Sequence, residues 1–259
     1  MKSWNPVLTV LLAACLFIAA GAPSVSLSSP LERRAHKLTQ EGKYLQAQKI
    51  YQKILKDKRL TPDKAQTIRK DYEDLNFKIL FSRFSDSDSL MHSVEPGQSL
   101  YKIAKKYNTT IGLIKKANGL QSDKIYPGMK LKVVNGVFSI LVNRSENVLT
   151  LSLNGRPVRH YTVATGANNG TPAGEFKIAT KLENPTWYKA GAVAPPGSPE
   201  NALGTRWLGF DYHGYGIHGT IEPNSIGRHV TAGCVRMLNE EVEELYTLVP
   251  VGAKVTVTD

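Results

Sequence analysis

The chain has 259 residues, with 33 lysines and arginines against 22 aspartates and glutamates, and a net charge of +11. Hydrophobic residues make up 41% and charged residues 21%, which is typical of a folded globular protein and excludes a disordered or collagen-like chain. The two cysteines, Cys15 and Cys234, exclude a disulfide-rich scaffold and a multi-cysteine zinc site. The positive charge predicts an anionic partner such as a nucleic acid, a membrane surface or an acidic polymer.

The N-terminus has the pattern of a secretory signal. Lys2 precedes an apolar run at 7–20, and small residues follow it. We therefore expect residues 1–22 to be a signal peptide or membrane anchor, and the protein to be exported to the periplasm or cell envelope. The N-terminus could be cleaved, lipidated at Cys15, or retained so that it associates with the membrane. Cleavage leaves Cys234 as the only thiol, either as a buried apolar residue or as a reactive group.

Residues 31–83 carry apolar side chains at the spacing of amphipathic helices. Thr61 and Pro62 predict a helix start, because threonine can cap the first turn and proline fits its first position. This stretch resembles one tetratricopeptide repeat, through Ala35, Leu38, Gly42, Tyr44, Ala47 and Tyr51. Repeats of that kind bury their core by stacking, so we expect residues 23–85 to be a short helical segment that packs on a neighbour, acts as a spacer or binds a protein partner. Serines and aspartates then predict a linker at 86–91.

Residues 92–135 predict a small α+β unit in the order strand, helix, helix, strand. Its sequence includes VEPGQSLYKIAKKYNTTIGLIKKANGLQSDKIYPGMKLKV, with a Pro-Gly turn near each end and two short helical apolar faces between them. This stretch closely resembles a LysM domain over its whole length. The resemblance implies binding of glycans that contain N-acetylglucosamine, in a shallow groove between two loops.

The two glycan-binding loops are placed by the same resemblance. The residues that would line the groove are Gly97, Gln98, Ser99, Leu100, Ile125, Tyr126, Pro127 and Gly128. Glycines in these loops could also serve only to make the turns.

Residues 136–259 show the pattern of a mainly β domain. Short β-rich runs occur at 138–142 and 148–153, and Asn154-Gly155 is a strong hairpin signal. A clear helix is predicted only at 239–248.

The candidate chemistry lies in the stretch YGIHGTIEPNSIGRHVTAGCVRM, which contains His218 and Cys234. A histidine beside a cysteine can take the thiol proton and create the thiolate nucleophile. Gly233 allows a sharp turn, where adjacent backbone N–H groups can stabilise a developing oxyanion. His213 and His218 lack the spacing of a zinc protease motif, so we expect no metal.

This stretch resembles the active-site signature of the L,D-transpeptidases, the YkuD-like family, and TPAGEF at 171–176 resembles the early hairpin of that family. The resemblance implies the L,D-transpeptidase fold, a catalytic Cys234 nucleophile and a His218 base that the Gly219 carbonyl orients. It also implies that the backbone N–H groups of Gly233 and Cys234 form the oxyanion hole, and that Thr231 supports the turn. Arg236 and Tyr215 would bind the substrate. Arg236 could equally form a structural ion pair. Many members have histidine where this chain has Ala232.

The implied reaction is acyl transfer on a peptidoglycan tetrapeptide stem, with loss of the terminal D-alanine and no cofactor. An amine of a second stem would then accept the acyl group, giving a 3→3 cross-link in cell-wall biogenesis. Another acceptor could also take the acyl group, or water could, which would make the enzyme an L,D-carboxypeptidase. Two other functions stay open. A cell-wall cysteine peptidase of NlpC/P60 type usually has its cysteine before its histidine, the reverse of the order here. A non-catalytic wall-binding protein would not need an intact histidine and cysteine.

The positive charge lies outside the predicted catalytic region. Residues 31–80 carry 13 basic and 7 acidic side chains and residues 90–135 carry 8 and 2, whereas residues 137–259 carry 10 and 11. This distribution favours retention on an anionic cell wall, with peptidoglycan as the partner, over binding to nucleic acid, for which no motif is present.

Overall fold

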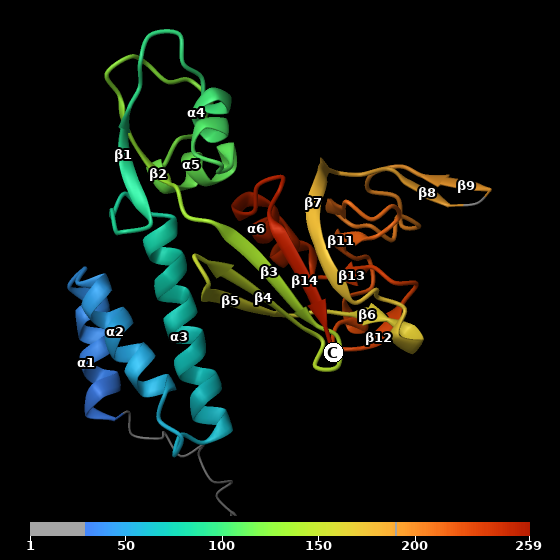
Figure 1. Cartoon of the computed structure of the whole chain (residues 1–259), viewed down its shortest axis with the longest axis horizontal. Helices are drawn as coiled ribbons and strands as arrows, with labels where there is room; N and C mark the ends of the chain where they lie inside the picture. The colour runs from blue at the N-terminus through green and yellow to red at the C-terminus, as the bar shows by residue number, and fades with distance from the viewer. Residues whose placement is uncertain (1–28, 190) are drawn as a thin grey trace, which may run out of the picture.

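The computed structural model describes residues 29–189 and 191–259, and the predicted signal at 1–22 lies outside them. Three helices come first (Figure 1). They are α1 (Pro30–Gln40), α2 (Tyr44–Leu55) and α3 (Pro62–Leu80). Thr61 caps α3, with Pro62 in its first turn, which confirms the predicted helix start. Ser29 and Glu32 form a capping box on α1.

The second unit has the predicted order strand, helix, helix, strand. Its elements are β1 (Ser89–Ser93), α4 (Leu100–Lys106), α5 (Ile111–Asn118) and β2 (Lys130–Val134). Strands β1 and β2 pair antiparallel, with Ser89 opposite Val134. Because this pairing begins at Ser89, the predicted linker at 86–91 is too long at its C-terminal end.

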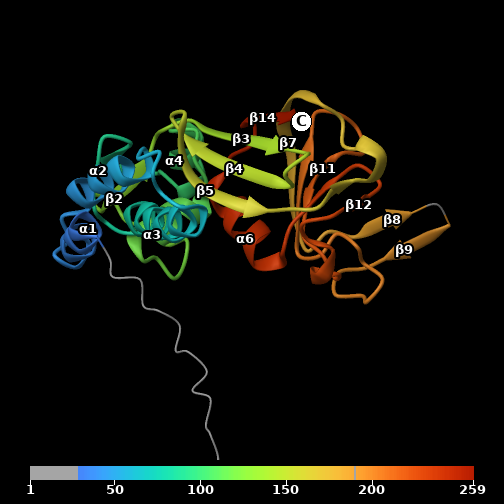
Figure 2. The same ribbon diagram turned by 90° about the horizontal axis from the view of Figure 1, so that it is seen from below.

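The third unit is built on an eight-stranded sheet with the order β13-β11-β10-β7-β14-β3-β4-β5 (Figure 2). Its strands are β3 (Phe138–Asn143), β4 (Val148–Leu153), β5 (Arg156–Thr162), β7 (Gly174–Glu183), β10 (Arg206–Phe210), β11 (Gly216–His218), β13 (Val235–Arg236) and β14 (Lys254–Thr258). The helix α6 (Asn239–Leu248) packs against β10 and β11 and has the predicted bounds. The mainly β fold of this unit is therefore confirmed.

Smaller elements complete the third unit. Two strands, β6 (Thr165–Gly166) and β12 (His229–Thr231), pair in parallel beside the main sheet. A separate hairpin, β8 (Trp187–Lys189) with β9 (Ala192–Ala194), projects from the end of β7 (Figure 1). Two short 3₁₀ helices, η1 (Ala167–Asn169) and η2 (Pro223–Ser225), lie in the connecting loops.

The three units pack on one another. Helix α3 lies along the edge strand β5, where Asn76 donates a hydrogen bond to the Val158 carbonyl and Glu73 pairs with His160 at 2.6 Å. The buried Lys132 of β2 donates its ammonium protons to the carbonyls of Ile79 and Ser82, at the end of α3. Ile79 lies in the last turn of α3 and Ser82 just beyond it, where carbonyls lack a partner within the helix, so the lysine bonds to both and joins the first unit to the second. Burial lowers the pKa of Lys132 to about 8.

No helix within the described ranges is both long enough and apolar enough to cross a membrane.

Candidate functional site

The site is built on the parallel pairing of β11 with β13. Ile217 lies opposite Val235, and His218 lies opposite Arg236. Side chains alternate along a strand, so the residue before Val235, Cys234, faces the same side of the sheet as His218. The Met237 N–H donates to the His218 carbonyl at 2.9 Å, which fixes this register.

His218 is held in one tautomer. Its Nδ1 lies 2.7 Å from the Gly219 carbonyl oxygen. Because a carbonyl only accepts hydrogen bonds, Nδ1 carries the proton and Nε2 is left as a base. The contact expected from the sequence is therefore present.

The imidazole is buried and neutral at physiological pH. His218 is 5% exposed, and the Trp207 ring stacks on it with 6.0 Å between ring centroids and an interplanar angle of 21°. Burial lowers the pKa of His218 to about 4, because a charged imidazolium is poorly solvated there. The nearby Arg236 acts in the same direction, against the opposing effect of the Gly219 carbonyl.

Cys234 is a partly exposed thiol. It donates to the Gly214 carbonyl, with 3.6 Å between sulfur and oxygen. Burial raises the pKa of Cys234, although the Gly216 N–H and Arg236 oppose that effect by stabilising the thiolate. The resting site thus holds a neutral thiol and a neutral imidazole, not a preformed ion pair.

The turn before Cys234 is fixed by Thr231. Its hydroxyl donates to the Cys234 carbonyl at 2.6 Å and accepts from the Gly233 N–H at 3.2 Å. This supports the turn as expected, but it also engages the Gly233 N–H that the sequence assigned to the oxyanion hole. Of the two amides expected there, the Gly233 amide would have to give up the Thr231 bond before it could reach a substrate oxygen.

Gly233 cannot carry a side chain. Its φ is +140°, and a Cβ would lie 2.6 Å from the Tyr215 ring and 2.8 Å from the Gly170 carbonyl oxygen. Tyr215 thus lies directly against the turn, where the sequence placed it as a wall of the site. Its ring stacks on Tyr212, with centroids 5.0 Å apart.

Arg236 forms a structural ion pair, one of the two roles considered for it from the sequence. Its Nη1 lies 2.6 Å from a Glu222 carboxylate oxygen and 3.0 Å from the Ser225 hydroxyl. Its Nε is buried and has no hydrogen-bond acceptor among the described residues. Nη1 therefore has a structural role, because it links the guanidinium to Glu222 and Ser225.

Asn239 and Trp207 belong to the site but were missed in the sequence. The Asn239 amide oxygen accepts from the N–H groups of Thr205 and Thr220 at 3.2 and 3.0 Å, and its nitrogen donates to the Thr220 carbonyl at 2.8 Å. A Cβ on Gly219 would lie 2.1 Å from that oxygen, so the loop after His218 is packed tightly on Asn239. These contacts are long-range, and only the glycine before Thr220 hinted at a close approach.

The two predicted glycan loops lie side by side. Val94 exchanges backbone hydrogen bonds with Met129 and Gly128, at 2.9 and 2.8 Å, which brings the loops to the same end of β1 and β2. Tyr126 is 67% exposed. Leu100, also predicted to line the groove, is 2% exposed and its side chain packs in the core of this unit, so it could face a glycan only through its backbone.

The other predicted loop residues have mainly structural contacts. Gln98 bonds to His92 and Glu95 through its side chain, and Ser99 caps α4. Gly97 and Gly128 adopt positive φ angles of 76° and 84°, as their turns require. Ile125 packs partly on the core, and Pro127 is exposed.

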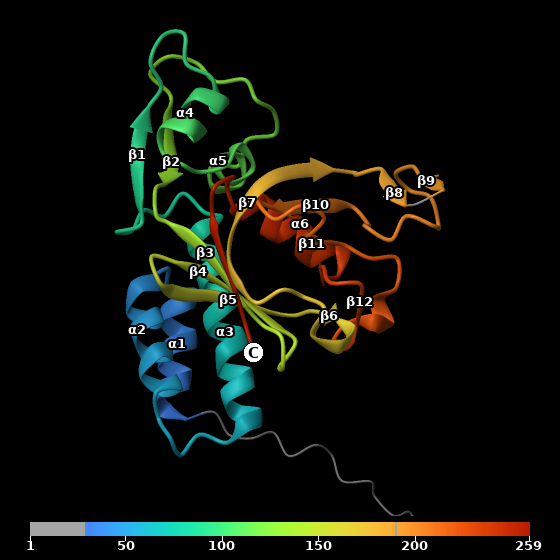
Figure 3. The same ribbon diagram turned by 45° about the vertical axis from the view of Figure 1, so that its right-hand side comes forward.

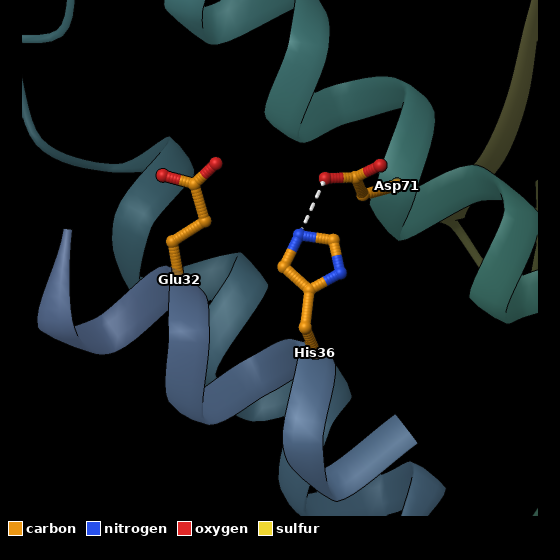
Figure 4. A group of neighbouring side chains, drawn as sticks. All are labelled: Glu32, His36 and Asp71. Carbon is orange, nitrogen blue, oxygen red and sulfur yellow. Dashed lines mark ion pairs between the residues drawn. The ribbon is translucent and has the colours of Figure 1, made fainter. Parts of the chain in front are cut away.

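A second group of side chains was considered as a metal centre. Within residues 29–189 and 191–259, Glu32, His36 and Asp71 could together offer three ligand atoms, each within 4.8 Å of the others (Figure 4). His36 Nε2 already pairs with Asp71 at 3.2 Å, and the Lys64 ammonium lies 2.7 Å from Glu32. These ion pairs explain the cluster as a link between α1 and α3. Elsewhere, His213 is exposed, and His229 bonds to Thr165 and Asn147.

Comparisons with known proteins match both C-terminal units. The model of the L,D-transpeptidase catalytic domain, YkuD, matches residues 138–257, and the model of the LysM domain matches residues 92–134. YqjB of Bacillus subtilis is 44% identical over 126 residues, which cover 46% of this chain and 70% of that protein. YkuD of Bacillus licheniformis is 35% identical over 177 residues, which cover 65% of this chain and 99% of that protein. Both have L,D-transpeptidase in their names.

The chain belongs to the YkuD family of L,D-transpeptidases. It is therefore an enzyme of peptidoglycan, and the family resemblance seen in the sequence is confirmed. His218 and Cys234 both lie within the matched catalytic domain. The peptidase and non-catalytic alternatives lose their support. The helical segment at α1–α3 is an addition outside both matched regions.

The pKa of His218 predicts how the stability of the transpeptidase changes with pH. An unfolded imidazole titrates near 6.5, whereas the folded protein holds His218 near 4, so the unfolded state binds more protons between these values. The free energy of unfolding should therefore fall as pH drops from 6.5 to 4, by up to about 1.4 kcal/mol per pH unit from this group. Denaturant unfolding of the wild type and His218→Gln across this range measures it. Equal pH slopes in the two proteins would contradict a buried neutral imidazole.

Asn239 predicts a large stability effect. Asn239→Ala leaves two N–H groups and one carbonyl without their partner and should lower the free energy of unfolding by about 2–4 kcal/mol. Glu240→Ala, on the exposed side of the same helix, is the matched control and should change it little. Thermal or denaturant unfolding compares them, and equal small effects would show that Asn239 does not hold the loop after His218.

Proposed function

We propose that this transpeptidase uses Cys234 as its nucleophile and His218 as its general base. The single observation that carries the proposal is the register of β11 with β13, which turns Cys234 to the same face of the sheet as His218, whose Nδ1–H bonds to the Gly219 carbonyl and leaves Nε2 as a base. The register, the tautomer and the free thiol each support the assignment. Gly219 and Thr231 act as positioning residues, because they orient the base and the cysteine turn.

The first step transfers the stem acyl group to sulfur. His218 Nε2 takes the Cys234 proton while sulfur attacks the carbonyl of the third stem residue, meso-diaminopimelate. Since the resting pair is neutral, proton transfer is coupled to the attack and does not precede it. The tetrahedral intermediate then collapses, its C–N bond breaks, and the imidazolium returns the proton to the leaving D-alanine amine.

The second step releases the acyl group. An amine of a neighbouring stem attacks the thioester carbonyl, and His218 takes its proton. The C–S bond breaks, the sulfur regains a proton, and a 3→3 cross-link forms. Water or a free D-amino acid in place of that amine would give hydrolysis or exchange through the same thioester.

Two residues are proposed to bind the substrate. Arg236 lies two positions after Cys234 and pairs with Glu222, and its guanidinium is proposed to meet a stem carboxylate. Tyr215 packs against Gly233 and would form a wall of the cleft beside the thiol. The Cys234 N–H is the proposed oxyanion donor, because the Gly233 N–H is occupied by Thr231.

The LysM domain is proposed to hold the enzyme on the glycan. Its two loops meet at one end of β1 and β2, and the exposed Tyr126 ring offers an apolar face to a sugar. Residues 90–135 carry a net charge of +6, which suits an anionic wall. We accordingly propose that the protein is exported and acts in the periplasm or cell envelope.

Cys234→Ala tests the catalytic assignment. Without the thiol no thioester can form, so release or exchange of D-alanine from purified tetrapeptide muropeptides should fall at least about 1,000-fold. Val230→Ala, an exposed change four residues away, should leave the rate unchanged. Mass spectrometry of the products also identifies the acceptor. Turnover at the wild-type rate in Cys234→Ala would contradict the proposed mechanism.

Tyr126→Ala tests the glycan assignment. Removing the exposed ring should weaken binding to oligomers of N-acetylglucosamine about 5-fold or more, because stacking on the sugar is lost. Met91→Ala, which removes another exposed apolar side chain of the same domain, serves as the control. Calorimetry measures both affinities, and equal affinities for the two variants would place the glycan elsewhere.

A further inference from the structure

The LysM domain is fixed to the catalytic domain through helix α5. The side chain of Leu113 is fully buried in the core of the catalytic domain. Gly112 lies so close to α6 that a Cβ there would be 3.2 Å from Thr247 Cγ2, and the Thr110 hydroxyl donates to the Thr247 carbonyl. Figure 3 shows α5 close to α6, in agreement with the contacts between these two helices. The two domains therefore hold one mutual orientation through buried contacts.

A groove of about 960 Å³ runs along this junction. One wall comes from α4, α5 and the loop after α5, including Tyr101, Lys116 and Gln121. The other comes from β7 and α6, including Glu183 and Tyr246. The Tyr101 side chain is 64% exposed. The groove thus combines an aromatic face with amide and charged groups, a chemistry suited to an acylated amino sugar with carboxylates.

Two of the lysine side chains in the groove wall already have partners within the protein. The Lys181 ammonium donates to the carbonyls of Tyr246 and Val249 and lies 4.1 Å from the centre of the Tyr246 ring. Lys115 pairs with Asp123 at 2.6 Å. These contacts shape a preformed wall, and Tyr101 and Gln121 remain as exposed groups on its LysM side.

Residues that adjoin the two glycan loops in the sequence line the groove. Tyr101 directly follows the first loop, Gly97 to Leu100, and Asp123 closely precedes the second, Ile125 to Gly128. A glycan strand seated in those loops and longer than they can hold would therefore extend close to the groove. Its other wall belongs to the catalytic domain.

We propose that this interdomain groove is a binding site for the continuing peptidoglycan strand, and that it carries the strand from the LysM loops onto the catalytic domain. This site rests on the proposed glycan function of the LysM domain. Its occupant is a polymer of N-acetylated amino sugars with peptide stems. A short oligosaccharide fills only the loops, and an isolated stem reaches the cysteine without entering the groove.

The test compares polymer with fragments. The double variant Tyr101→Ala, Gln121→Ala removes two exposed groups of the groove and is made in a Cys234→Ala background, so that binding is measured without turnover. Its binding to purified peptidoglycan sacculi, measured by co-sedimentation, should weaken about 5-fold or more. Its affinity for short oligomers of N-acetylglucosamine should stay unchanged. Met91→Ala in the same background is the control.

Each outcome decides the proposal. Unchanged binding to sacculi would overturn it, and so would an equal loss for short oligomers, because the effect would then belong to the LysM loops. With Cys234 restored, the double variant should turn over soluble tetrapeptide at the wild-type rate, and a loss there would also overturn the groove as a strand site. An inactive wild type would instead contradict the catalytic proposal and leave the binding result intact.

Discussion

The site depends on one backbone constraint, the parallel pairing of two very short strands. The pairing of β11 with β13 turns His218 and Cys234 to the same face of the sheet although a long loop separates them in the sequence. The pairing is held from several sides: Met237 bonds to the His218 carbonyl, and Arg236 exchanges both backbone hydrogen bonds with Ala164. Short strands have little intrinsic stability, so the surrounding contacts must specify the register. A shift of one residue would turn the thiol to the opposite face.

The same packing sets the protonation of His218 and Cys234, the proposed catalytic pair. Trp207 covers the imidazole, and Asn239 fixes the loop whose Gly219 carbonyl selects the tautomer. Burial favours the neutral form of both His218 and Cys234. The site therefore holds a neutral thiol and a neutral imidazole at neutral pH. A neutral imidazole can accept a proton, as the proposed general base must.

Local sequence signals predicted much of this architecture. The Thr-Pro start of α3, the bounds of α6 and the order of elements in the LysM domain follow from caps, periodicity and turn residues, which act over a few positions. The His-Gly and Gly-Cys motif located the site because its chemistry requires those residue types. The predicted linker at 86–91 was too long because strand pairing, which is a long-range contact, makes β1 begin at Ser89.

Features created by tertiary contacts could not be read from the sequence. Leu100 lies in a predicted glycan loop, yet it faces the core, since the helix it begins must bury one side. The Gly233 N–H bonds to Thr231 because the turn folds back on itself. Asn239 and Trp207 reach the site from elements that are adjacent only in the folded chain. The junction between α5 and α6 is of the same kind.

The central claim is that the stem is carried as a thioester on Cys234. Its most direct test is mass spectrometry of the protein after rapid acid quench during turnover of a tetrapeptide stem, followed by peptide mapping. The account predicts an added mass equal to the stem acyl group without D-alanine, located on the peptide that contains Cys234 and removed by hydroxylamine. An unmodified Cys234 peptide during sustained turnover, or an adduct on another residue, would contradict it.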